Sequence, residues 1–279
     1  MNNRLIVIMG PTAVGKTTTA IEMAQQLHTH ILSFDSRQFY SELNIGVARP
    51  TSEELSAAPH HFIANRSVTQ PYNIFQYQEE ALQLLDELFK EHETVIAVGG
   101  SALYAEALCH GVAVLPDPSP ELRAKLTKQL QTEGVESLQK QLKVLDPEYY
   151  AKVDKQNGVR LQRAIEVCLT AGKPYSELLK GSRVERPFKI DYHVVKTTPE
   201  NLRNRINLRV DMMMQQGLLD EVKQLVEYRN LNTLNTVGYR ELFAYLDGKL
   251  SLDEAVLQIK NHTWQYAKKQ LTWLKKLIK

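Results

Sequence analysis

The chain has 279 residues, of which 43% are hydrophobic and 24% charged, so it can bury a core in one large domain or two smaller ones. Its 34 basic and 32 acidic residues give a formal net charge of +2, which by itself indicates no polyanionic partner. No apolar run approaches the roughly 20 residues needed to span a bilayer, and the first residues contain no cleavable signal segment. Cys109 and Cys168 lack metal-ligand spacing and are typical of buried thiols in a reducing compartment. We therefore expect a cytoplasmic protein without a membrane partner.

Strand and helix patterns alternate in the first 115 residues. Continuous apolar runs predict strands buried on both faces, and amphipathic segments predict helices between them. The strands are predicted at 5–9, 31–34 and 94–98, and the helices at 18–27 and 73–89. This alternation is typical of an α/β fold with a parallel sheet and right-handed crossovers.

A proline cluster at residues 115–120 interrupts this pattern, because proline continues neither a helix interior nor a central strand. From Ser119 to about Lys180 the sequence is helical, with Ser119 as the predicted N-cap. A strand is then predicted at 190–195, and helices are predicted at 200–215, 218–228, 238–246 and 251–276. We predict a catalytic core made of residues 1–115 and 186–279, into which residues 116–185 are inserted as an all-helical domain.

The strongest local motif lies between the first predicted strand and the first predicted helix. Residues 10–17 read Gly10-Pro11-Thr12-Ala13-Val14-Gly15-Lys16-Thr17 and match the phosphate-binding loop pattern in full. Backbone N–H groups and the positive end of the following helix would surround an anion. Lys16 would contact terminal phosphate oxygens, and the Thr17 hydroxyl would ligate Mg²⁺. The motif predicts a P-loop-type parallel sheet that binds a phosphate compound.

Two features expected of an ATPase or GTPase are missing from the sequence. The apolar run at 95–98 ends in Gly-Gly-Ser rather than in a magnesium-holding Asp, and no Asn-Lys-x-Asp segment is present to read guanine. Phosphoryl transfer depends on such scaffolding. The sequence therefore argues against a nucleotide-driven motor or switch.

Asp35 follows the second predicted strand, and Gly99-Gly100-Ser101 follows the third. Ligands of open parallel sheets lie outside the carboxyl ends of the strands, so these residues should share a crevice with the phosphate loop. A carboxylate in that crevice is repelled by bound phosphate, which favours a role as general base or Mg²⁺ contact. The alternative, an Asp that only caps the next turn, remains open from this residue alone.

Further motifs occur in order along nearly the whole chain. They are Asp35-Ser36-Arg37-Gln38-x-Tyr40, Gly46-x-Ala48-x-Pro50, Gly99-Gly100-Ser101-x-Leu103-Tyr104, Asn157-Gly158-x-Arg160-x-x-Arg163-Ala164-Ile165-Glu166-Val167, Gly172-Lys173-Pro174, Arg205-Ile206-Asn207-x-Arg209-Val210-Asp211, Val237-Gly238-Tyr239-Arg240-Glu241 and Tyr266-Ala267-Lys268-Lys269-Gln270-Leu271-Thr272-Trp273. Together they resemble the tRNA dimethylallyltransferase (IPP transferase) family far more specifically than the phosphate loop does. The resemblance implies transfer of a dimethylallyl group from its diphosphate to N6 of adenosine 37, next to the tRNA anticodon.

The resemblance also implies roles for individual residues. Diphosphate would be the leaving group, held by the loop amides, by Lys16 and by Mg²⁺ near Thr17. Arg205 and Arg209 would be further contacts of the diphosphate. Asp35 would take the proton of the amine, and Ser101, which stands where the family usually has Thr, would bond the flipped adenine or its backbone. The residues implied to contact the anticodon stem-loop are Asp35, Ser36, Arg37, Gln38, Ser101, Arg123, Val159, Arg160, Leu161, Gln162, Arg163, Lys268 and Lys269.

The segment after Glu254 gives modest independent support for an RNA partner. It contains six lysines, no acidic residue, and the interleaved aromatic residues Trp264, Tyr266 and Trp273, which suits a phosphate backbone. A helix with its aromatic side chains in the core and its lysines in water explains the pattern equally well. Three residues depart from the family pattern, and they bear on tRNA affinity rather than on the reaction. These are Lys269 in place of Arg, Leu274 in place of Phe, and Arg203 where an aromatic residue or His is common.

Three other functions remain open. A P-loop small-molecule kinase would share the loop but would need an Arg-rich lid, and an isopentenyltransferase acting on free adenine nucleotides would share both the loop and Asp35. A non-catalytic RNA-binding module would need neither. The helical insertion and the basic terminal segment favour an RNA substrate. We expect a monomer that binds tRNA and dimethylallyl diphosphate, with Mg²⁺ as the cofactor.

Overall fold

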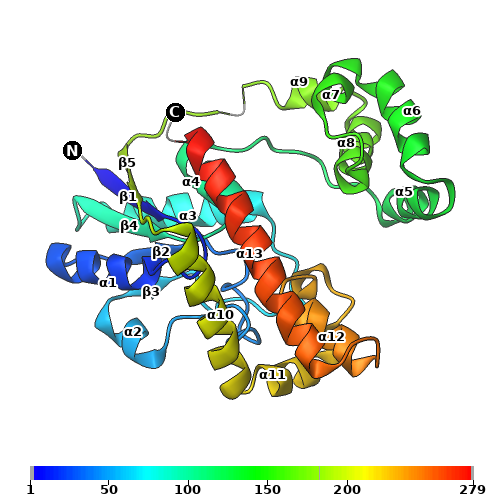
Figure 1. Ribbon diagram of the computed structural model, residues 1–279. Helices are drawn as coiled ribbons and strands as arrows, with labels where there is room; N and C mark the ends of the chain where they lie inside the picture. The colour runs from blue at the N-terminus through cyan, green and yellow to red at the C-terminus, as the bar shows by residue number, and fades with distance from the viewer. Residues whose placement is uncertain (1–2, 182, 278–279) are drawn as a thin grey trace. The chain divides into compact units, whose positions relative to one another are not determined.

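The structure, a computed structural model, describes residues 3–181 and 183–277 and separates into two compact units (Figure 1). Unit 1 comprises Met1–Cys109 and Arg186–Lys279, and unit 2 comprises His110–Glu185. Unit 1 is therefore built from two separate stretches of sequence. Unit 2 begins at His110, somewhat before the predicted start of the helical insertion.

A five-stranded parallel sheet forms the centre of unit 1, in the order β3-β2-β4-β1-β5. The strands are β1 (Arg4–Met9), β2 (Ile31–Ser33), β3 (His60–His61), β4 (Thr94–Val98) and β5 (Lys189–Val194). All but β3 confirm predicted strands, with ends that differ by at most one residue. β3 has only two residues, too few for a recognisable pattern. Because the strands are parallel, their carboxyl ends lie at one edge of the sheet.

Helices cover both faces of this sheet, which explains the continuous apolar runs of its strands. On one face, Ile6 and Ile8 of β1 pack with Ala20 and Ala24 of α1 (Lys16–Leu27). The opposite face, which includes Leu5 of β1, packs against the larger core cluster. That cluster draws on α3 (Ile74–Leu88), α4 (Ala102–His110), α10 (Pro199–Gln215), α11 (Leu218–Gln224), α12 (Tyr239–Leu246) and α13 (Leu252–Leu277). Figure 1 shows α10 and α13 side by side, and they are in contact.

Local sequence signals account for most helix ends. Asn73 accepts hydrogen bonds from the N–H groups of Phe75 and Gln76, and the Gln76 side chain accepts from the Asn73 N–H at 2.9 Å, a complete capping box at the start of α3. Two predictions were wrong in extent. α1 begins at Lys16, directly in the phosphate loop, and the segment predicted as one helix over 218–228 is divided into α11 and the 3₁₀ turn η1 (Val226–Tyr228).

The remaining short elements of unit 1 lie in its connections. α2 (Ser52–Ala57) precedes β3, and a second 3₁₀ turn, η2 (Asn232–Leu234), precedes α12. Cys109 and Cys168, from units 1 and 2, are buried free thiols, as predicted. Over the described ranges, no helix combines the length and apolarity needed to cross a bilayer.

Unit 2 is helical. It contains α5 (Pro120–Glu133), α6 (Val135–Leu145), α7 (Pro147–Lys152), α8 (Gly158–Ala171) and α9 (Tyr175–Leu178). Ser119 caps α5 as predicted, accepting a hydrogen bond from the Leu122 N–H at 3.2 Å. Leu126, Leu142 and Leu161 belong to its own apolar core. The buried Asp146 accepts from the Tyr149 N–H at 2.9 Å and from the Ser176 N–H at 2.6 Å, and so ties α7 to α9.

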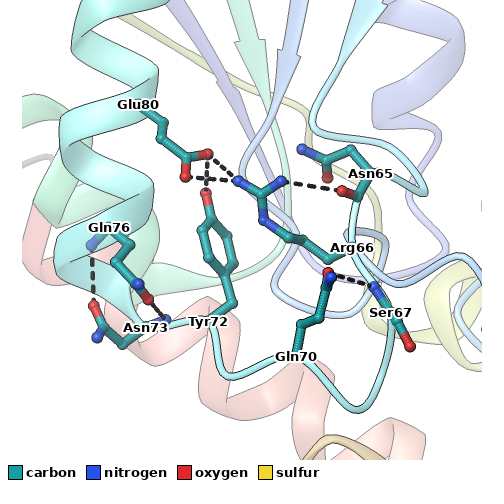
Figure 2. A network of polar contacts seen from close by, with 8 residues as sticks. All are labelled: Asn65, Arg66, Ser67, Gln70, Tyr72, Asn73, Gln76 and Glu80. Atoms are coloured by element: carbon teal, nitrogen blue, oxygen red, sulfur yellow. Dashed lines mark hydrogen bonds and ion pairs between the residues drawn. The ribbon is translucent and has the colours of Figure 1, made fainter.

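A charged network holds the connection between β3 and α3 in place (Figure 2). The Arg66 guanidinium donates to the Glu80 carboxylate at 2.6 Å and lies 4.7 Å from the centre of the Tyr72 ring, and the Tyr72 hydroxyl donates to Glu80 at 3.0 Å. The backbone of Arg66 also bonds to Phe39 and Ser41. The network therefore fixes the connection against the segment that follows β2, where Asp35 lies.

Candidate active site at the carboxyl edge of the sheet

The phosphate loop leaves β1 and enters α1 at Lys16. Gly15, the residue before α1, has φ 101°, a left-handed conformation that favours glycine. Within the described part of the chain no side chain caps α1, so its first N–H groups are available to an anion. The structure thus places the predicted motif between a buried strand and a helix, the context that phosphate binding requires.

Three cationic side chains gather at this loop. Lys16, Arg205 and Arg209 line a cavity of about 1330 Å³. A Cβ atom added to Gly15 would lie 3.3 Å from the Arg205 guanidinium, and Arg209 donates to the Thr12 hydroxyl at 3.5 Å. Both arginines come from α10, one helical turn apart. The two arginines predicted as diphosphate contacts therefore lie beside the phosphate loop.

Burial, with a smaller contribution from neighbouring positive charge, lowers the pKa values of Lys16 and Arg209. Burial lowers the pKa of the Lys16 ammonium to about 8, with Asp35 opposing the shift and Arg209 adding to it. Burial also lowers the pKa of Arg209, and the neighbouring Arg205 lowers it further. The Lys16 ammonium donates to the Pro11 carbonyl at 2.9 Å. Such a concentration of positive charge is stabilised by a bound polyanion such as diphosphate.

The surroundings of Thr17 fit a magnesium ion that is shared with a phosphate ligand. Thr17 lines the cavity and is partly buried. Among the same residues no group of three or more His, Cys, Asp or Glu side chains could hold a metal by itself. Mg²⁺ usually takes one or two protein oxygens together with substrate phosphates and water, so Thr17 with a diphosphate is a suitable donor set.

Asp35 lies beyond the carboxyl end of β2 and lines this cavity. One of its carboxylate oxygens accepts a hydrogen bond from the Arg37 N–H at 3.1 Å, which fixes the side chain in a turn. Because β4 separates β2 from β1 in the sheet, Asp35 faces the phosphate loop across the end of β4. Asp35 therefore stabilises the turn that follows β2 and also lines the cavity of the phosphate loop.

A second cavity, of about 450 Å³, adjoins the first. The two cavities share wall residues, among them Thr12, Asp35, Ala48, Arg209 and Met213. The first also has apolar walls from loop 44–49 and α10, whereas the second extends past Ser36 toward α12 and α13. Asp35 thus stands between a cavity lined by the phosphate loop and a cavity lined by the C-terminal helices.

Ser101 lies next to Asp35, but its hydroxyl is engaged with the protein. It accepts from the Ser36 N–H at 3.0 Å and donates to the Ser36 hydroxyl at 3.0 Å. The side chains of Arg37 and Gln38 are engaged as well. Arg37 donates to the Thr233 carbonyl at 2.9 Å, and Gln38 donates to the Ala48 carbonyl at 2.9 Å. These residues, predicted as RNA contacts, hold the walls of the cavities together in the structure.

Two residues with no predicted role organise the site. The buried Gln270 of α13 accepts from the Thr12 N–H at 2.8 Å and donates to the Gly100 carbonyl at 2.8 Å, and so joins the phosphate loop to the end of β4. Glu221 of α11 accepts from the N–H groups of Ile45 at 2.7 Å and Gly46 at 3.0 Å. No local motif indicates either contact, although Gln270 lies inside the last motif of the family pattern.

The residues predicted to contact RNA from α8 have different environments. Val159 is 75% exposed and Arg160 is exposed, whereas Leu161 is fully buried in the core of unit 2, so its side chain is not available at the surface. Arg123 and Arg163 flank the buried Glu166 at 3.6 and 3.8 Å. Gln162 also donates to Glu166, at 3.0 Å. Glu166 therefore holds the side chains of Arg123, Gln162 and Arg163 close together on unit 2.

Lys268 and Lys269 follow each other on α13. Lys269 lines the second cavity, and the Lys268 ammonium lies 6.0 Å from the centre of the Trp264 ring. Both also line a shallow depression with Gln265, Thr272 and Trp273. Cationic and aromatic side chains therefore occur together on this helix.

Comparison with known proteins decides the family. Residues 38–277 match the family described as IPP transferase. The chain belongs to the IPP transferase family. It is 45% identical, over 99% of its length and 91% of the relative's, to the tRNA dimethylallyltransferase of Christiangramia forsetii. It is 44% identical over 98% of its length and 88% of the relative's to tRNA dimethylallyltransferase 1 of Bacteroides thetaiotaomicron.

Solved structures agree with this family and with the predicted fold. The tRNA isopentenylpyrophosphate transferase of Bacillus halodurans matches 99% of this chain and 87% of its own, with a TM-score of 0.69 and 31% identity. A eukaryotic dimethylallyltransferase acting on tRNA matches 98% of this chain and 70% of its own, with a TM-score of 0.79 and 25% identity. The predicted P-loop-like parallel sheet flanked by helices is confirmed.

Proposed function

We propose that this protein transfers a dimethylallyl group from dimethylallyl diphosphate to N6 of adenosine 37 of tRNA, next to the anticodon. The observation that carries the proposal is the position of Asp35 on the wall shared by two adjoining cavities. One cavity is lined by the phosphate loop with Lys16, Arg205 and Arg209, and the other leads toward a basic, aromatic helix. The names of the relatives, which describe tRNA dimethylallyltransferases, support the same reaction.

In this reaction the bond between the allylic carbon and the diphosphate oxygen breaks, and its electron pair leaves with the diphosphate. The lone pair of the adenosine amine forms the new carbon–nitrogen bond, and the amine proton passes to the Asp35 carboxylate. The amine is a poor nucleophile because its lone pair is conjugated with the purine. A positioned base typically contributes about 10²–10⁴-fold to such a step.

The leaving diphosphate would lie against the first N–H groups of α1, with Lys16, Arg205 and Arg209 around it. Donors arranged before the reaction stabilise the charge that develops on the leaving group, and this stabilisation often contributes more to catalysis than any other effect. The Thr17 hydroxyl would hold Mg²⁺, which supplies further positive charge to the diphosphate when bound. The apolar residues Ile45, Leu208 and Met212, in the walls of the same cavity, suit the dimethylallyl group.

The adenosine would enter from the second cavity, which Ser36, Tyr266 and Lys269 line. Enclosure and stacking of an unpaired base is the usual mode of loop recognition in RNA. Lys268 and Lys269 would contact the phosphate backbone. Unit 2, through Arg123, Arg160 and Arg163, would contact the anticodon stem-loop. Such a substrate, together with two free thiols, fits a protein that works in the cytoplasm.

The decisive experiment supplies the protein with labelled dimethylallyl diphosphate and Mg²⁺ and offers tRNA or AMP in separate reactions. A tRNA with guanosine at position 37 is the matched control. We expect label in the tRNA with adenosine 37 only, together with release of diphosphate. Label in AMP alone would indicate an enzyme of free nucleotides, and phosphoryl transfer from ATP in a parallel reaction would indicate a kinase. Either result would overturn the proposal.

A further inference from the structure

His262 and Glu241 form a pair beside the second cavity. The carboxylate of Glu241, only 3% exposed, accepts a hydrogen bond from the His262 ring nitrogen Nδ1 at 2.6 Å. Its other oxygen accepts from the Gly238 N–H at 2.8 Å at the start of α12. Glu241 is therefore held from two sides, and it fixes the orientation of an imidazole on the neighbouring α13.

The pairing also determines which nitrogen of His262 is available. A carboxylate oxygen accepts, so Nδ1 carries the proton, and in the neutral ring Nε2 keeps a lone pair. Nε2 has no hydrogen-bond partner in the described part of the chain. The side chain is 37% exposed and is part of the cavity wall. His262 thus offers one oriented acceptor to whatever occupies the second cavity.

The position of His262 relative to Asp35 indicates what that acceptor meets. Tyr266, one turn further along α13, donates to the Gly100 carbonyl at 3.3 Å. A Cβ atom added to Gly100 would lie 3.4 Å from the Asp35 carboxylate, so Tyr266 is close to Asp35. His262 lies about 6 Å further along the helix axis, since four residues of α-helix rise about that far. In an adenosine the ribose is attached on the side of the purine away from the N6 amine. Asp35 and His262 both line the second cavity. A nucleoside that occupies this cavity with its amine at Asp35 therefore has its ribose in a space that His262 also lines.

We propose that His262 accepts a hydrogen bond from the ribose 2′-hydroxyl of the nucleotide that is modified, and that Glu241 positions His262 for this contact. The inference rests on the proposed function. The 2′-hydroxyl is the group that distinguishes RNA from DNA at a given nucleotide, and as a donor it matches a neutral Nε2. His262 is then a substrate-binding residue and Glu241 a positioning residue.

The test uses anticodon stem-loop RNAs that carry a single 2′-deoxy substitution, either at the modified nucleotide or at one of its two neighbours. In the unchanged protein, deoxy substitution at the modified nucleotide should lower kcat/KM by about 3–10-fold, the worth of one neutral hydrogen bond. His262→Asn keeps a donor for Glu241 but lacks an atom at the Nε2 position. This variant should show the same loss with all-ribose RNA and no additional loss with the deoxy RNA.

Two further variants separate binding from structure. His262→Gln keeps an acceptor near the Nε2 position and should retain part of the sensitivity to the deoxy substitution, while Glu241→Gln should lose most of it. Lys269→Ala removes a cation from the same cavity and should weaken RNA binding while leaving the deoxy penalty unchanged. The KM for dimethylallyl diphosphate should stay the same in the His262 variants. The deoxy penalty is a ratio of two kcat/KM values from one preparation, so partial unfolding, which lowers both values equally, would not change it.

An equal deoxy penalty in the unchanged protein and in His262→Asn would overturn this inference alone, as would a His262-dependent penalty confined to the neighbouring nucleotides. Loss of salt dependence in His262→Asn with an unchanged deoxy penalty would reassign the residue to a phosphate and also overturn it. Absence of transfer to any RNA by the unchanged protein would overturn the proposed function and this inference with it.

Discussion

At the scale of single residues, Asp35 has a structural role in a turn and a proposed catalytic role as a base. One oxygen of its carboxylate holds the turn to Arg37, while the group as a whole lines both cavities. An Asn side chain would keep the carbonyl acceptor for that turn but would not accept the amine proton. The two roles can therefore be separated by one substitution.

We expect Asp35→Asn to lower the single-turnover rate of transfer by at least about 10²-fold, because the general base is lost. The affinity for tRNA, measured by a filter-binding or fluorescence titration, should remain nearly unchanged, because the fold of the turn is kept. A turnover rate close to that of the unchanged protein would remove Asp35 from the role of base.

Lys16 leads to a prediction about pH. Its pKa is lowered to about 8 by burial, so in the free protein the ammonium is charged below that pH and neutral above it. Binding of diphosphate requires the charged form. The affinity for dimethylallyl diphosphate should therefore fall as the pH rises above about 8, by up to about tenfold per pH unit.

Calorimetric titrations between pH 7 and 9.5 measure this dependence. Lys16→Arg is the matched control, because a guanidinium stays charged throughout this range; it should bind more weakly than Lys16 at pH 7 but with little change above pH 8. A flat curve for the unchanged protein would show that Lys16 does not titrate in the free site.

At the scale of elements, loop 44–46 is held by a carboxylate of α11, a helix far from the loop in the sequence. Glu221 accepts from the N–H groups of Asn44, Ile45 and Gly46 and from the Tyr239 hydroxyl. Gly46 lies so close to the Tyr239 ring that an added Cβ would be 2.6 Å from it. Because this loop lines both cavities, its position depends on α11 and α12.

Glu221→Gln places an amide donor against these backbone donors. We expect it to lower the free energy of unfolding by about 1–3 kcal/mol, as measured by urea denaturation, and to raise the KM for dimethylallyl diphosphate. Tyr239→Phe is the control, since it removes a single hydrogen bond to the same carboxylate and should cost about 0.5–1.5 kcal/mol. If Glu221→Gln were no more destabilising than this control, the loop would not depend on the carboxylate.

Sequence patterns predicted some features of the fold and of the candidate site but not others. β1, the phosphate loop and Asp35 were predictable because each is encoded within a few neighbouring residues. The order of the strands was not, because right-handed crossovers allow several orders, and here β4 lies between β1 and β2. Glu221 and Gln270 act on residues more than 170 positions away, and side-chain contacts over such separations leave no local pattern. The buried position of Leu161 was missed because a motif does not reveal which side of a helix faces the core.

At the scale of the whole molecule, stability should depend on pH through histidines at the β2–β3 side of the sheet. His30 Nδ1 lies 2.8 Å from His61 Nε2, and the His92 ring is 4.9 Å from that of His30. Burial lowers the pKa of His30 and of His61, and repulsion from neighbouring histidines lowers both further. Their folded-state pKa values thus lie below the unfolded value of about 6.5.

A base whose pKa is lower in the folded state binds fewer protons there than in the unfolded chain. The free energy of unfolding should therefore be level above about pH 7 and should decrease as the pH falls below about 6.5. Denaturant unfolding at pH 5–8 measures this loss. His30→Asn should reduce it, while His28→Asn, at an exposed position, should leave it unchanged. An identical pH dependence in both variants would place its origin elsewhere.

The hydrogen bond between Gln270 and the phosphate loop can form only after α13 has been synthesised. Its hydrogen bond to Thr12 joins residues 258 positions apart, and β5, which pairs with β1, follows all of unit 2. Domains generally begin to fold during synthesis, starting from the N-terminal side. A growing chain therefore exposes the entire phosphate-loop motif long before β5 and α13 exist to support it. While unit 2 is being translated, unit 1 lacks β5. The edge of β1 that later pairs with β5 is uncovered during this time.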